Sequence, residues 1–226
     1  MRSDDARACA GYDCSRARTC CLPSAHWGVG LTSISRGFHV VSWSRSRPSE
    51  PIEGVTYNHG DLLDEDVLRS VVDGADVVVG ALSPRGALDG SLRFLYSQVA
   101  DLAQKAGVRL GIVGGAGSLR VEEGGRTLAS LPDFPEEFRS EAGQLAAVLE
   151  DLRSRSDDLQ WFFVSPAGNF GSYNPGTHTG HFRLGGDVLL TDENGVSDIS
   201  GADFALAFVD EIETPAHKGQ RFTVAY

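Results

Sequence analysis

The sequence has little positive charge, and that shortage limits its partners. Lysine and arginine number 20 against 31 aspartate and glutamate residues, which gives a formal net charge of −11. Because nucleic-acid binding needs a basic surface to neutralise phosphates, we expect no nucleic-acid partner. Long apolar runs are missing too: none approaches the roughly 18 residues of a membrane span, and none has the form of a secretory signal. We therefore expect a cytoplasmic protein without membrane association.

Cysteine is absent after residue 21. The four cysteines are Cys9, Cys14, Cys20 and Cys21. Zinc is held by pairs with about two to four intervening residues and matching partners downstream, whereas here the spacings are four, five and zero and only His26 is nearby, so no metal site is expected. The first 47 residues also carry seven arginines against three aspartates, unlike the acidic remainder. We interpret residues 1–17 as an atypical tail, disordered in one reading, and residues 18–226 as one domain.

Short apolar runs alternate with helical patterns along the rest of the chain. The strand-like runs are 18–22, 38–43, 54–59, 75–81, 108–113, 159–165 and 221–225. The helical patterns are 64–72, 91–106, 136–153 and 201–212. This alternation predicts an α/β fold, a Rossmann-like doubly wound parallel sheet with crossover helices. Near the end, Asn194-Gly195 predicts the tight turn of a hairpin around residues 192–195.

Several segments carry a family resemblance. They are RGFHVVSWSR (36–45), HGDLLD (59–64), GADVVVGALSP (74–84), AGVRLGIVGGAGSL (106–119), DFPEEF (133–138), FVSPAGNF (163–170), GHFRLGGDVLLTDENGVSDIS (180–200) and HKGQRFTVAY (217–226). In these the chain resembles atypical short-chain dehydrogenase/reductase proteins of the NAD(P)H-binding, NmrA-like group, especially the bacterial NADH-flavin reductase branch. The resemblance implies a nicotinamide cofactor and a small C-terminal substrate lobe, with residues 166–200 as the substrate-covering segment.

The expected phosphate-binding loop is only half present. A dinucleotide-binding loop uses glycines for a tight turn, for close approach of the pyrophosphate and for helix packing. In SAHWGVG (24–30), Gly28 and Gly30 fit that pattern and are predicted cofactor residues, whereas Ser24 and Trp27 replace the two front glycines. Two interpretations stay open: a degraded loop on an intact domain, or a segment 1–35 translated from a shifted reading frame.

The other predicted cofactor contacts follow the strands. The resemblance places Arg45 against an NADP 2′-phosphate, which favours NADP over NAD, although a solvated arginine is the simpler alternative. It places Asp61 near the adenine, with a helix-capping turn as the alternative. Ligands of open α/β sheets bind at the carboxyl ends of strands. The loop residues predicted there are Ala81, Leu82, Ser83, Gly114, Gly115 and Gly117. For the three glycines, the alternative role is a turn with positive φ.

The catalytic pair of the short-chain dehydrogenases is missing. Their base is a tyrosine with a lysine four residues later, but Phe138 stands near the expected place, and the only lysines are Lys105 and Lys218. Alcohol dehydrogenase and epimerase chemistry are therefore unsupported. Hydride transfer to a flavin or quinone, which needs mainly positioning, stays open. Ser118 and His178 are candidate hydrogen-bond or proton donors, His178 with His181 beside it; ordinary loop residues are the alternative.

Two functions from different classes follow. The first is an NADPH-dependent reductase of a small flavin or quinone-type acceptor. The second is a non-enzymatic, NmrA-like dinucleotide-sensing or scaffold protein with weakened cofactor binding, which the altered loop and the missing tyrosine–lysine pair motivate.

Overall fold

Eight strands form one sheet in the part of the chain that the computed structural model describes, residues 18–22, 27–155 and 158–226. The strands are β1 (Arg18–Leu22), β2 (His39–Ser44), β3 (Thr56–His59), β4 (Val77–Gly80), β5 (Arg109–Val113), β6 (Trp161–Ser165), β7 (Arg183–Gly185) and β8 (Gln220–Ala225). Their order in the sheet is β3-β2-β1-β4-β5-β6-β8-β7. All neighbours pair in parallel except β7, which is antiparallel to β8. The predicted Rossmann-like sheet is confirmed.

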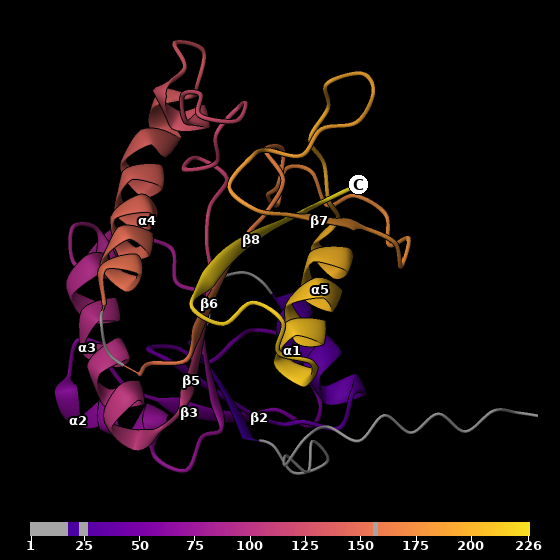
Figure 1. Ribbon diagram of the computed structural model, residues 1–226. Coiled ribbons are helices and arrows are strands. Elements are labelled where there is room, and N and C mark those ends of the chain that lie inside the picture. Colours follow the sequence, from indigo (N-terminus) through magenta and orange to yellow (C-terminus); the bar gives the residue numbers. More distant parts are fainter. Residues whose placement is uncertain (1–17, 23–26, 156–157) are drawn as a thin grey trace, which may run out of the picture.

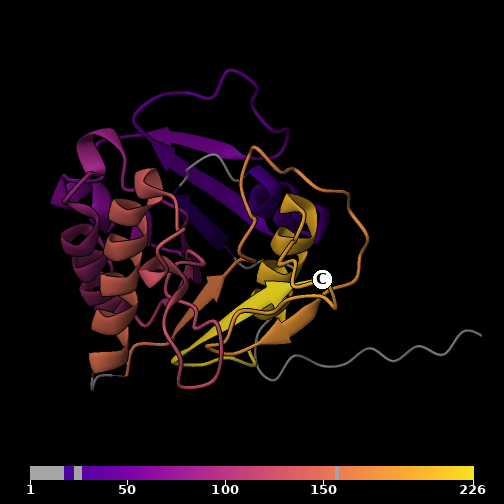
Figure 2. The same cartoon turned by 90° about the horizontal axis from the view of Figure 1, so that it is seen from above.

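Helices cover both faces of the sheet (Figure 1, Figure 2). They are α1 (Trp27–Ser35), α2 (Glu65–Val72), α3 (Leu92–Ala106), α4 (Glu136–Ser154) and α5 (Gly201–Glu213), with short 3-10 turns η2 (Gly86–Leu88) and η3 (Leu128–Ser130). Helices α2, α3 and α4 pack on one face, and α1 and α5 pack together on the other. No helix in the described ranges combines the length and apolar character needed to span a bilayer.

The alternation of side chains along the strands divides the core into two layers. In β4, Val78 packs under α2, α3 and α4, whereas Val77 and Val79 pack under α1 and α5. In β6, Phe163 joins the first layer and Phe162 the second. Successive strand residues point to opposite faces, so a strand buried on both sides reads as a continuous apolar run. That is the pattern from which the central strands were predicted.

Strand β1 confirms the strand predicted at residues 18–22, since it pairs in parallel with β2 on one side and β4 on the other. The tight turn predicted at Asn194-Gly195 is present, with the Gly195 N–H donating to the Asp192 carbonyl at 3.1 Å and the Asp192 N–H to the Val196 carbonyl at 2.8 Å. No strand flanks it within the described residues 186–200, so the hairpin predicted around it is wrong. The Asp192 side chain closes the turn further, accepting the backbone N–H groups of Asn194 and Val196 at 2.8 Å each. The predicted tail, residues 1–17, lies outside the described residues.

Candidate functional site

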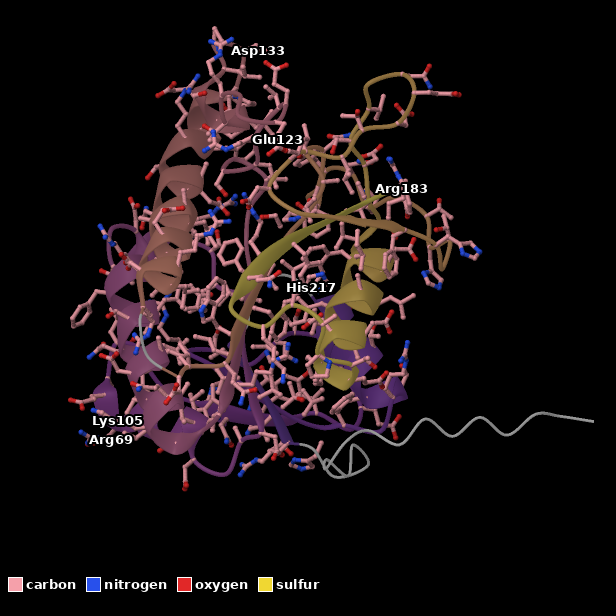
Figure 3. All side chains as sticks on the ribbon, in the orientation of Figure 1. Arg69, Lys105, Glu123, Asp133, Arg183 and His217 are labelled. Carbon is pink, nitrogen blue, oxygen red and sulfur yellow. The ribbon has the colours of Figure 1, made fainter. Side chains whose placement is uncertain are left out.

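The carboxyl ends of the parallel strands define the candidate site. Figure 3 shows Glu123, Asp133 and Arg183 at the end of the molecule where the loops after β5 and β6 extend beyond the sheet. Arg69 and Lys105 lie at the opposite end. Helices that follow parallel strands begin at the carboxyl edge, so α1 and α4 start on the side of the candidate site. Helix α5 also starts there, since the N–H of its N-cap Ser200 donates to the hydroxyl of Tyr226, the residue after β8, at 3.1 Å.

The glycine loop after β5 is built for close packing. A Cβ on Gly114 would lie 1.9 Å from the Phe163 ring, and a Cβ on Gly117 would lie 2.6 Å from the Ala142 methyl group of α4. Gly115 has more room, with Leu145 at 3.3 Å. None of these three glycines has a positive φ, so the alternative reading as a left-handed turn is wrong. They are glycines because backbone, ring and helix approach one another here.

The loop after β4 lies beside α4. Ala81 and Leu82 are buried, and the Leu82 N–H donates to the Tyr96 hydroxyl at 3.3 Å. Ser83 is half-buried and its hydroxyl lies 3.3 Å from Glu141 Oε1 on α4. The strand-end positions of the predicted residues are therefore as expected, although Ser83 already has a protein partner that sequence reasoning missed.

Basic groups gather at the ends of β2 and β3. Arg45 follows β2 directly and is exposed. Two residues on, Arg47 donates from Nε to Nε2 of His59, the last residue of β3, at 3.0 Å. Asp61 accepts the Leu63 N–H at 3.1 Å. This contact agrees with the turn alternative for Asp61, while its predicted adenine contact stays a prediction.

Helix α1 begins at Trp27, so Gly28 and Gly30 both lie in its first turn. Residues 23–26, which include Ser24, lie outside the described residues, and the Trp27 side chain is likewise not described. A Cβ on Gly30 would make only an ordinary contact with Ile52, at 3.8 Å. Glycine at position 30 is therefore not required for packing, unlike Gly114 and Gly117.

Ser118 takes part in an ionic network. Its hydroxyl oxygen accepts from Arg221 Nη1 at 3.0 Å. The Arg221 side chain is 2% exposed and pairs with Asp187 at 2.5 Å, and Asp187 also pairs with Arg153 of α4 at 2.5 Å. Arg221 uses one of the two lone pairs of the Ser118 oxygen, and this contact leaves the hydroxyl hydrogen to donate to a ligand.

His178 is oriented by a buried carboxylate. Its Nδ1 lies 2.7 Å from Asp203 Oδ1; the His178 side chain is 60% exposed and that of Asp203 is fully buried. Asp203 also accepts hydrogen bonds from the residues around it. These donors are Thr179, Gly180, Ser200 and the Tyr226 hydroxyl. Burial alone would raise the pKa of Asp203, but these hydrogen bonds outweigh it and hold the pKa well below the ordinary range.

Sequence reasoning missed Asp203 and Tyr226. The spacing Ser200-x-x-Asp203 was an available signal for a helix start, because Ser200 is the N-cap of α5 and accepts the Asp203 N–H at 3.0 Å. No sequence pattern predicts the contact between Tyr226 and Asp203, which forms because β8 ends beside the start of α5. His181, also exposed, has no corresponding carboxylate contact among the described residues.

Helix α4 contains no tyrosine, and Phe138 lies in its first turn. Both lysines lie at the amino edge of the sheet, since Lys105 ends α3 before β5 and Lys218 precedes β8. Neither lysine is therefore at the carboxyl edge, where it could replace the lysine of the missing tyrosine–lysine pair.

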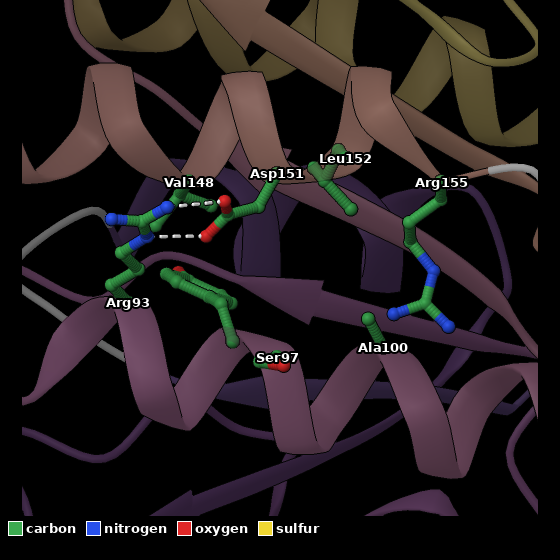
Figure 4. A pocket seen from close by; sticks show the side chains of 8 residues that line it. Arg93, Ser97, Ala100, Val148, Asp151, Leu152 and Arg155 are labelled. Atoms are coloured by element: carbon green, nitrogen blue, oxygen red, sulfur yellow. Dashed lines mark hydrogen bonds and ion pairs between the residues drawn. The ribbon is translucent and has the colours of Figure 1, made fainter.

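A shallow pocket elsewhere carries no predicted site residue. It lies between α3 and α4, and the Arg93–Asp151 pair, with contacts of 2.6 and 2.7 Å, spans it (Figure 4). Its other lining residues include Ser97, Val148 and Arg155. Because it opens between two helices and away from the strand ends, it is separate from the candidate site.

Fold and strand-end loops together define a Rossmann-like dinucleotide-binding protein of the atypical short-chain dehydrogenase/reductase type. The family model described as NAD(P)H-binding matches residues 32–215, so the chain belongs to this NAD(P)H-binding family. The matched range begins after the altered loop.

Named relatives agree with this assignment. The chain is 44% identical over 117 residues to the Bacillus subtilis protein YwnB, a match that spans 51% of this chain and only 54% of YwnB. Among solved structures, a Streptococcus pneumoniae protein named as a candidate NADH-flavin reductase is 31% identical, with a TM-score of 0.77 over 93% of this chain and 98% of that one. A Bacteroides thetaiotaomicron protein named as a candidate epimerase is 30% identical, with a TM-score of 0.82 over 93% and 97% of the two chains.

Proposed function

We propose that this chain binds NADPH across the carboxyl ends of its strands and reduces a flavin or quinone-type acceptor. The observation that carries the proposal is the combination of a closely packed glycine loop at β5 with Phe138 in the first turn of α4. Such a site can position a nicotinamide ring and an acceptor, but it has no tyrosine at this place to act as a base. The nicotinamide, when bound, supplies the hydride, so positioning is the main requirement on the protein.

The described residues suit such a cofactor. Arg45, beside Arg47 at the end of β2, is the group we assign to the 2′-phosphate, because guanidinium groups bind phosphate through paired N–H donors. We assign Ala81, Leu82 and Ser83, with Gly114, Gly115 and Gly117, to the nicotinamide side, and Gly28 and Gly30 to the pyrophosphate at the start of α1. Asp61 is assigned to the adenine.

The acceptor would lie under residues 166–200. Ser118 keeps a hydroxyl hydrogen for it, and His178 presents Nε2 outward because its Nδ1 faces Asp203. Either group could hold or deliver a proton at the acceptor. A cytoplasmic location and the lack of a nucleic-acid partner stay predictions.

Calorimetry and turnover test the proposal together. NADPH is titrated into the chain, and NADPH oxidation is followed with FMN and with a small quinone. Arg45→Ala is expected to weaken NADPH binding about tenfold and to leave NADH binding unchanged, since a charge-assisted contact contributes ~1.5 kcal/mol or more. Arg69→Ala is the control, an exposed arginine at the opposite end. Absence of NADPH binding in every titration would remove the proposal.

The altered loop predicts weak binding by the chain as it stands. Charge-assisted bonds from helix-start N–H groups contribute ~1.5–3 kcal/mol each, so denying the pyrophosphate two of them weakens binding about a hundredfold. Replacing Ser24 and Trp27 together by glycine is expected to restore it. An unchanged affinity would mean that no phosphate loop exists there to repair; tight binding by the unaltered chain would mean that Trp27 points away from the phosphates.

The dinucleotide-sensing or scaffold role is the second candidate, favoured by the Ser24 and Trp27 replacements. It predicts that NADPH raises the melting temperature without turnover of any acceptor. At a hundredfold excess over Kd a ligand stabilises the folded state by ~2.7 kcal/mol, so the shift is measurable. NADPH oxidation coupled to FMN reduction would exclude this role in favour of the first.

A further inference from the structure

An aromatic pair joins two segments that come from opposite sides of the sheet. Phe138 of α4 and Tyr173, in the segment after β6, have ring centroids 6.5 Å apart and ring planes inclined by 25°. Phe138 is half-buried, whereas Tyr173 is 62% exposed. Aromatic pairs attract at centroid separations of about 4.5–7 Å, so this contact links α4 to the 166–200 segment at the outer limit of that range.

The Tyr173 ring is held in a fixed turn. The Asn174 N–H donates to the Gly171 carbonyl at 3.0 Å, and Asn174 Nδ2 donates to the Asn169 carbonyl at 2.8 Å and to Asp198 Oδ1 at 2.5 Å. A Cβ on Gly171 would lie 2.4 Å from the Tyr173 ring, so the ring lies directly against the Gly171 backbone. The ring is therefore oriented by the protein before any ligand arrives.

This pair stands beside the glycine loop. Phe138 and Ala142 are four residues apart on α4 and share one face of the helix. Ala142 is the residue against which Gly117 packs. Phe138 therefore lies one turn before Ala142, toward the start of α4, on the helix face that contacts the predicted nicotinamide loop. Tyr173, from the segment after β6, continues this surface beyond Phe138.

We infer that Tyr173, backed by Phe138, is the stacking platform for the planar ring of the acceptor and determines a preference for aromatic acceptors. This inference rests on the proposed reductase function and names a residue for its acceptor subsite. A flat isoalloxazine or quinone ring gains contact area and ring–ring attraction on an exposed aromatic face that is already fixed.

Riboflavin binding tests the inference without relying on turnover. Riboflavin is titrated against the protein with saturating NADP⁺, and quenching of its fluorescence is recorded. Tyr173→Ala is expected to weaken binding about tenfold and Tyr173→Phe to change it less than about twofold, because the ring and not the hydroxyl makes the stack. Phe94→Ala is the matched control, since Phe94 is 64% exposed on α3, and it should leave binding unchanged.

Steady-state kinetics separate this inference from the proposed function. In the Tyr173→Ala chain the KM for FMN should rise about tenfold while the KM for NADPH and the affinity for NADP⁺ stay constant. If the unaltered chain oxidises NADPH with FMN and Tyr173→Ala does so with the same KM and the same riboflavin affinity, the platform is wrong and the reductase stands. If the unaltered chain neither binds riboflavin nor oxidises NADPH with FMN or with a small quinone, both are wrong. If it oxidises NADPH with the quinone alone, the reductase stands, and the platform is wrong unless Tyr173→Ala raises the KM for that quinone about tenfold.

Discussion

Helix α5 carries a buried carboxylate near each end, and the surroundings of the two differ. Asp203 in the first turn is fully buried, and Glu211 near the last turn is 3% exposed. Each lies 2.7 Å from Nδ1 of a histidine, His178 and His217 respectively. The other partners of Asp203 are neutral donors, whereas Glu211 also pairs with the buried guanidinium of Arg109 at 2.5 Å.

The two ends of α5 face opposite edges of the sheet. Asp203 lies at the carboxyl edge, where ligands of α/β sheets bind, and its histidine is 60% exposed. Glu211 lies at the amino edge, and its histidine is 24% exposed and stacked on Phe222 at 4.2 Å. A carboxylate–histidine pair is thus open to solvent at the carboxyl edge and enclosed at the amino edge. Position relative to the sheet edge distinguishes a candidate proton donor from a structural contact.

Removing the charge of Glu211 should have the largest effect. Glu211→Gln leaves the Arg109 guanidinium buried without its counter-charge, and breaking a buried pair costs about 3–5 kcal/mol of unfolding free energy. Urea unfolding at neutral pH measures the loss. The control is Asp210→Asn on the same helix, whose pair with Arg36 is partly exposed and should change stability by less than about 1 kcal/mol. Equal losses would contradict the enclosed character of the amino end.

Asp203→Asn should have a smaller, pH-dependent effect. The donors to Asp203 are Thr179, Gly180, Ser200 and Tyr226. Because they depress the folded-state pKa below the ordinary 3.8, the stabilisation by the carboxylate is fully present above that value and is lost as the pH falls through the folded-state pKa. We expect Asp203→Asn to lose about 2–3 kcal/mol at pH 7. Urea unfolding at several pH values should show the gap between variant and wild type narrowing below about pH 4; a constant gap would contradict the assignment.

The sequence predicted most of the sheet because burial on both faces leaves a readable pattern. VVVG in β4 and WFFVS in β6 are continuous apolar runs, and each is fully buried. Strand β7 could not be found this way. Its three residues, Arg183–Gly185, are mostly exposed and become a strand only by pairing with β8, some forty residues later.

The site was predictable where it follows from topology. Arg45, Ser83 and Gly114 lie at strand ends, and parallel strands bring such ends to one edge. Contacts between distant segments were not predictable: Ser118 and Arg221 are 103 residues apart and meet because of β8. The sequence also could not show why glycine stands at 114 and 117. The reason is the side chain packed against each of them, Phe163 and Ala142, and not their own backbone angles.

The two histidines provide the smallest and most selective comparison. His217→Ala removes a ring stacked on Phe222 and a hydrogen bond to Glu211, so we expect a loss of about 1–2 kcal/mol. His178→Ala should lose less than about 0.5 kcal/mol, because the His178 side chain is 60% exposed to solvent and the buried Asp203 carboxylate keeps its other donors.

Urea unfolding ranks the two variants by their loss of unfolding free energy, and NADPH oxidation with FMN provides the second measurement. If His178 delivers a proton to the acceptor, its variant loses turnover while remaining folded, and the His217 variant retains turnover while losing stability. Equal stability losses with equal turnover would mean that exposure does not distinguish the two ends of α5, and His178 would then be one more structural contact.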